Sequence, residues 1–103
     1  MPIRLTEDEK TKYCVMLGEH LKRLRAIVGF TQEELADLSG ISAGRISRIE
    51  NGSSVMRWSQ FVSFVMVFFM NANSKDYLFA SRIITPKLLQ ALQMKEAQMP
   101  PDV

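Results

Sequence analysis

The sequence has little of what enzymes, disulfide-bonded domains and metalloproteins need. Its 103 residues include one cysteine, Cys14, and one histidine, His20, and they contain no glycine-rich phosphate-binding loop. A single cysteine cannot form an internal disulfide, and we expect the protein to reside in the reducing cytoplasm. Because no nucleophile, base and orienting group form a recognisable set, we expect no enzyme activity, no metal site and no cofactor.

Long apolar runs and a strong net charge are also missing. The longest apolar stretch, FVSFVMVFFM at residues 61–70, is about half of the roughly 20 residues that a membrane-spanning helix needs. It predicts a core or interface helix and no association with a membrane. The net charge is only +2, but basic and acidic residues fall in separate segments. Such segregation is a weak indication of a polyanionic partner.

Signals for helix boundaries are frequent along the chain, whereas strand signals are nearly absent. Thr6 and Glu9 form a capping-box pattern that predicts the start of a first helix, and Gly29 ends it. Gly18 lies inside this segment and is a poor helix former, so a break there is one alternative. Residues 57–70 are predicted to form a helix and residues 75–80 a helical turn at most. A last helix is predicted at residues 86–98.

Two further helices are predicted between residues 31 and 52, and each has about two turns. Thr31 and Ser42 are their expected N-caps, and Asn51-Gly52 ends the second one. Helices of this length are unstable alone in water, so both must pack against the rest of the domain. The side chains expected to face inward are Leu35, Ala36 and Leu38 in the first helix, and Ile46 and Ile49 in the second.

Such a pair of short helices is typical of a helix-turn-helix, in which the second helix enters the major groove of DNA. The crossing needs a small residue in the first helix and a residue that tolerates positive φ in the turn. Ala36 and Gly40 occupy these positions. The outward face of the second helix is short, basic and free of large apolar groups, and it consists of Ser42, Ala43, Gly44, Arg45, Ser47 and Arg48.

The segment from Leu17 to Gly52, LGEHLKRLRAIVGFTQEELADLSGISAGRISRIENG, resembles the phage repressor and Cro family of regulators, also called the XRE family. The match includes both the TQEELA opening and the IENG ending. It implies an all-α, lambda-repressor-like five-helix DNA-binding domain with an additional C-terminal helix. We expect the DNA-binding domain to cover residues 1–80, with its helix-turn-helix at 31–52. Residues 81–103 would form a C-terminal helical extension, which is a candidate dimerisation segment.

The resemblance also implies roles for individual residues. Gln32, at the N-terminus of the second helix, is expected to contact a phosphate of double-stranded DNA. The start of the third helix is expected to read bases in the major groove. Ala43 and Gly44 lack the amides that many relatives use there, so we expect Arg45 and Arg48 to supply most of the direct hydrogen bonds, with guanine as their target.

A structural ion pair and a dimer complete the expectations. The resemblance implies that Arg25 contacts Glu50 at the end of the reading helix. A helix that is apolar on nearly every side needs cover, and we expect a homodimer or the C-terminal helix to cover part of it. The residues in question are Phe61, Phe64, Phe68 and Phe69.

Three functions remain open at the level of sequence. The first is a sequence-specific transcriptional regulator, most simply a dimeric repressor that reads a near-palindromic operator. The second is the antitoxin of a toxin-antitoxin pair, in which the C-terminal part binds a protein partner. The third is a protein interaction module that has lost DNA binding.

Overall fold

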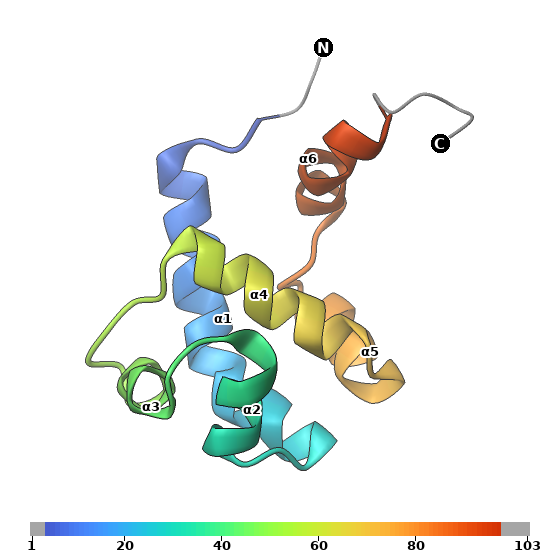
Figure 1. The fold of residues 1–103 in the computed structure, drawn as a ribbon. Coiled ribbons are helices and arrows are strands. Elements are labelled where there is room, and N and C mark those ends of the chain that lie inside the picture. Colours follow the sequence, from blue (N-terminus) through green and yellow to red (C-terminus); the bar gives the residue numbers. More distant parts are fainter. Residues whose placement is uncertain (1–3, 98–103) are drawn as a thin grey trace.

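The computed structural model describes residues 4–97 as six α-helices, with no strand in that part of the chain (Figure 1). The predicted all-α class is therefore confirmed. In chain order the helices are α1 (Glu7–Val28), α2 (Gln32–Ser39), α3 (Ala43–Glu50), α4 (Trp58–Phe69), α5 (Ala72–Ala80) and α6 (Pro86–Ala97). The predictions for residues 98–103 lie outside the described part.

The helices are arranged around α1 and α4, which cross each other (Figure 1). Helices α2 and α3 pack near one end of the molecule, where α3 contacts α1 and α2 contacts α4. Helix α5 packs against both α1 and α4. Helix α6 stands at the opposite end from α2 and α3, so the C-terminal helix and the helix-turn-helix lie far apart (Figure 1).

The first two helices begin where the sequence predicts, because groups close in the chain cap them. The Thr6 side-chain oxygen accepts the backbone N–H of Glu9 at 3.1 Å, and the Glu9 carboxylate accepts the backbone N–H of Thr6 at 2.9 Å. Thr31 and Glu34 form the same reciprocal pair. Gly40 ends α2 with φ of 76°, a left-handed conformation that glycine adopts without steric cost.

Two local expectations are wrong, and the alternative of a break at Gly18 is excluded. Helix α1 continues through Gly18 without a break. Residues 72–80 form a complete helix rather than a single turn, because the Asn71 side-chain oxygen accepts the backbone N–H groups of Asn73 and Ser74 and caps it. Leu38, which we expected to face inward from α2, is 58% exposed. Only Leu35 anchors α2 as a fully buried residue.

The core is one apolar cluster to which every helix but the outer part of α6 contributes. Phe61, Phe64 and Phe68 of α4 have no exposed surface. They share the cluster with residues from α1, α2, α3 and α5, and with three residues of the C-terminal segment: Ile83, Ile84 and Leu88. These three phenylalanines are therefore covered within one chain and give no argument for a dimer, whereas Phe69 is only partly buried.

Polar contacts join α6 to α1 at the end far from the helix-turn-helix. The Tyr13 hydroxyl is hydrogen-bonded to the Thr85 hydroxyl, next to the first turn of α6. Lys87 forms an ion pair with Glu9, and this ion pair, together with the backbone N–H of Thr6, lowers the pKa of Glu9 to about 2. The C-terminal segment is thus attached to the five-helix body of its own chain.

Candidate nucleic-acid interface

Helices α2 and α3 form a helix-turn-helix whose inner side is fixed by a few apolar residues. Ile46 and Ile49 of α3 are buried, as is Ile41 in the turn. The Ser42 side-chain oxygen accepts the backbone N–H of Arg45 at 3.1 Å, and Ser42 is thereby the N-cap of α3. With its inner side held in this way, α3 presents one defined face to solvent.

That outward face is small and positively charged. Ser42, Gly44 and Arg48 are exposed, while Ala43 and Ser47 are half-buried. The Arg48 guanidinium lies along the helix, and its Nη1 atom is 3.6 Å from the place where a Cβ on Gly44 would stand. A face with one long side chain and otherwise only small ones allows the backbone of α3 to approach a groove floor closely.

The Arg45 guanidinium is held by groups of its own chain, in the loop after α3 and in α4. Its Nη1 atom donates to the Ser54 hydroxyl at 2.7 Å, and its Nη2 atom donates to the Val55 carbonyl oxygen at 2.9 Å. A longer contact of 3.3 Å joins Nη2 to the side-chain oxygen of Gln60 in α4. The guanidinium therefore ties α3 to the loop of residues 51–57 and to α4. Of the two arginines of α3, only Arg48 has its side chain on open surface.

Glu50 connects the reading helix α3 to two neighbouring helices, α1 and α2. Arg25 of α1 donates to both carboxylate oxygens of Glu50, at 2.7 Å from Nε and 2.9 Å from Nη2. The side chains of Arg25 and Glu50 are 16% and 5% exposed. The Gln32 side-chain amide of α2 also donates to Glu50, at 3.0 Å. Arg25 also donates a hydrogen bond from Nη1 to the Phe30 carbonyl oxygen, at 2.9 Å.

Opposing effects set the charge state of this Glu50 cluster. Burial acts to raise the pKa of Glu50, but the hydrogen bonds from Arg25 and Gln32 outweigh it, so the pKa is lowered. The pKa of Arg25 is raised, chiefly by its hydrogen bonds to Glu50. Both groups are therefore charged at neutral pH. Gln32, which we expected at a phosphate, is held here through its amide nitrogen.

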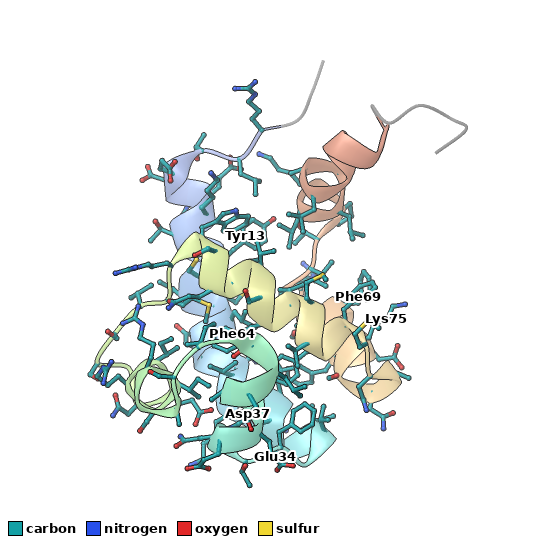
Figure 2. All side chains as sticks on the ribbon, in the orientation of Figure 1. Tyr13, Glu34, Asp37, Phe64, Phe69 and Lys75 are labelled. Atoms are coloured by element: carbon teal, nitrogen blue, oxygen red, sulfur yellow. The ribbon has the colours of Figure 1, made fainter. Side chains whose placement is uncertain are left out.

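A basic depression lies beside α3. The sequence did not predict a functional role for one of the three arginines that line it, Arg57. Arg57 lines it together with Arg45 and Arg48, between the α2–α3 turn and the start of α4. Arg57 occupies the N-cap position of α4 but makes no side-chain cap. Serine, threonine, aspartate and asparagine are favoured at that position. An arginine at a predicted N-cap was therefore the one feature of the sequence that could have indicated a functional role for Arg57. Apart from Glu50, which is paired with Arg25, the acidic residues of the helix-turn-helix lie on α2, among them Glu34 and Asp37 (Figure 2).

Other kinds of site find no support in the described part of the chain. No group of three or more His, Cys, Asp or Glu side chains among those residues is placed to hold a metal ion. None of the described helices combines the length and the apolar character that crossing a bilayer requires. Cys14 is buried, and its burial raises the pKa of the thiol.

The fold and this surface define a helix-turn-helix protein. A family model described as a helix-turn-helix domain matches residues 16–68, just over half of the chain. The chain belongs to this family and is a helix-turn-helix DNA-binding protein. The match covers the second half of α1, all of α2 and α3, and α4 up to Phe68. No curated protein and no solved structure gave a significant match.

Proposed function

We propose that the protein is a sequence-specific transcriptional regulator of the phage repressor and Cro type, and that it acts as a dimeric repressor on a near-palindromic operator. The observation that carries this proposal is the outward face of α3, on which Arg48 stands among Ser42, Gly44 and other small residues. The TQEELA and IENG segments support the assignment to the XRE branch. A repressor is the simplest form, because a bound dimer blocks a promoter without further contacts.

Arg48 is the base-reading residue in this proposal. Arginine most often recognises guanine by donating two hydrogen bonds to O6 and N7 in the major groove. Ser42, Ala43, Gly44 and Ser47 form the rest of the face, and their small size lets α3 approach the bases. Because Arg45 is bonded to Ser54 and Val55, we now assign it to the scaffold rather than to the bases.

Gln32 remains our candidate for a phosphate contact, with a modified role. It is the first residue of α2, where backbone N–H groups have no partner within the helix and the helix dipole favours an anion. Its side-chain amide nitrogen is bonded to Glu50, so the Glu50 cluster fixes the position of this helix end. We propose that the backbone N–H groups of the first turn supply the contact.

A homodimer is proposed because a single α3, eight residues long, reads too few base pairs to specify a site. Support also comes from exposed apolar residues at the outer edge of α4 and α5. Met66 is 65% exposed, Met70 84% and Phe79 40%. We call these three residues the apolar strip and assign it to the second copy. The centres of the Phe69 and Phe79 rings are 6.1 Å apart, and the Lys75 ammonium lies 4.4 Å from the centre of the Phe69 ring (Figure 2).

Selection of bound sequences from a random DNA duplex pool tests the proposal. We expect a near-palindromic site with guanine in each half-site. Arg48→Ala should weaken binding to that site by about 1 to 3 kcal/mol per half-site and relax the preference at one base pair. Arg82→Ala, which removes an exposed arginine near α6, is the matched control and should leave base preference unchanged.

Two results would contradict this function. Equal weakening of specific and random DNA by Arg48→Ala would show that Arg48 does not read bases. If the parent protein shows no salt-sensitive DNA affinity at all, the helix-turn-helix would instead serve protein interactions.

A further inference from the structure

The residues that line the basic depression favour the binding of an anion. It has a volume of about 390 Å³ and is lined by Arg45, Arg48 and Arg57, together with uncharged residues: Gly40, Ile41, Ser42 and Gln60. No acidic side chain is among the described residues that line it. Three guanidinium groups around one depression repel one another, and an anion bound between them relieves this repulsion.

The depression is built as a fixed frame rather than by chance proximity on the surface. One atom, Oε1 of Gln60, accepts the backbone N–H of Arg57 at 2.9 Å and the Nη2 group of Arg45 at 3.3 Å. Arg45 is further held by Ser54 and Val55. The start of α4 is therefore fixed relative to α3 by side chains. Arg57 itself is exposed and makes no cap to its own helix.

The position of Arg57 is unfavourable for the stability of α4, which suggests that its guanidinium is needed elsewhere. An N-cap residue with a short oxygen-bearing side chain stabilises a helix relative to a residue that makes no cap. A cation at a helix N-terminus also opposes the helix dipole. Guanidinium groups match the geometry of phosphate oxygens and donate paired hydrogen bonds to them.

We propose that the basic depression binds one phosphate group of the DNA backbone, with Arg57 as its main donor and Arg45 as a positioning residue. This inference rests on the proposed function, because it takes DNA on α3 as given. A backbone phosphate is the anion to expect, since the depression adjoins the reading face and shares Ser42 and Arg48 with it. The DNA contact surface thus extends from α3 to the start of α4.

The first experiment measures DNA affinity at several salt concentrations for the parent, Arg57→Gln, Arg57→Lys and the control Arg82→Gln. Removing a phosphate contact should weaken binding to all sequences alike and should reduce the slope of log K against log salt by about one per protomer. We expect this for Arg57→Gln, partial retention of affinity for Arg57→Lys, and parent behaviour for Arg82→Gln. An Arg57→Gln variant with the parent slope and affinity would overturn the inference.

The second experiment separates positioning from base reading at Arg45. Arg45→Lys keeps the charge but cannot reach three acceptors at once. We expect lower affinity with an unchanged base preference in the random-pool selection, and a similar loss in Gln60→Ala, which leaves Arg45 in place. A changed preference at one base pair in Arg45→Lys would mean that Arg45 reads a base, against this inference.

A third measurement distinguishes a DNA phosphate from a free one. The melting temperature is followed with inorganic phosphate for the parent and for Arg57→Gln. Stabilisation of the parent alone, combined with unchanged DNA binding in Arg57→Gln, would identify a small-anion site and contradict the DNA contact. If the parent binds DNA and only the Arg57 effects fail, this inference falls and the proposed function stands. If the parent binds no DNA, the proposed function itself falls.

Discussion

At the scale of single residues, Glu50 has the widest structural role in the helix-turn-helix. It sits at the end of α3 and accepts hydrogen bonds from Arg25 of α1 and Gln32 of α2. Three helices are thereby fixed at one carboxylate, whose side chain is almost wholly buried. A buried charge is costly unless it is paired, so the stability of the reading helix depends on both donors. Arg25 is the more important donor because it carries the opposite charge and makes two hydrogen bonds to the carboxylate, whereas Gln32 is neutral and makes one.

The first prediction concerns this ion pair. Arg25→Ala should lower the free energy of unfolding by about 3 to 5 kcal/mol, because Glu50 would keep its charge and lose its main partner. Combining Arg25→Glu with Glu50→Arg should restore part of this loss. Urea denaturation of Arg25→Glu, of Glu50→Arg and of the double variant measures the coupling free energy between the two residues. The exposed pair of Glu7 and Lys10 is the matched control, and Glu7→Gln should cost about 0.5 kcal/mol or less. Single variants at Arg25 and Glu50 as stable as the parent would contradict the prediction.

At the scale of elements, α3 owes its position to a close approach to α1. Gly18 lies in the middle of α1 and faces α3, with the Ile49 Cγ2 atom 3.4 Å from the position of a Cβ on Gly18 and the Met56 methyl group 3.9 Å from it. These distances correspond to ordinary van der Waals contact. One added methyl group therefore fits, whereas a larger side chain would push α3 away from α1.

The second prediction follows from this contact. Gly18→Ala should stabilise the protein by up to about 1 kcal/mol, because alanine favours the helix and its methyl group meets Ile49 without overlap. Gly18→Val should destabilise it, since its branched side chain would overlap Ile49. Thermal unfolding followed by circular dichroism measures both variants. If Gly18→Ala is clearly destabilising, the packing of α3 on α1 is tighter than described.

Element boundaries were predictable where the signal was local. Thr6, Thr31 and Ser42 act as caps through atoms three residues away, so their roles can be read from the sequence alone. Helix α5 was missed because its buried residues are only Ser74 and Leu78. A serine in place of an apolar residue hides the helical period. The Ser74 hydroxyl is satisfied by the Phe68 carbonyl oxygen, a contact that depends on the fold.

At the scale of the whole molecule, contacts between distant segments give side chains partners that the sequence does not show. Arg45 looks like a base reader in the sequence because it lies beside Arg48 on α3. Its partners Ser54, Val55 and Gln60 are 9 to 15 residues away, and only the packing of α4 on the domain brings them together. Likewise, the sequence leaves open whether a second copy or the C-terminal helix covers the phenylalanines of α4, because it does not show that Ile83, Ile84 and Leu88 join the same core.

The last prediction joins the reading face to assembly. Two copies related by a two-fold axis would place their α3 helices in successive major grooves, about 34 to 36 Å apart, so the half-sites should be about one helical turn apart. Met70→Glu should weaken the dimer by placing a charge in the apolar strip, whereas Lys12→Glu, near α6, should not. Analytical ultracentrifugation at tens of micromolar measures the dimer, and binding to full and half operators measures its consequence. We expect Met70→Glu to lose affinity for the full operator and to bind a half-site as the parent protomer does. A monomeric parent, or an operator without two-fold symmetry, would contradict this arrangement.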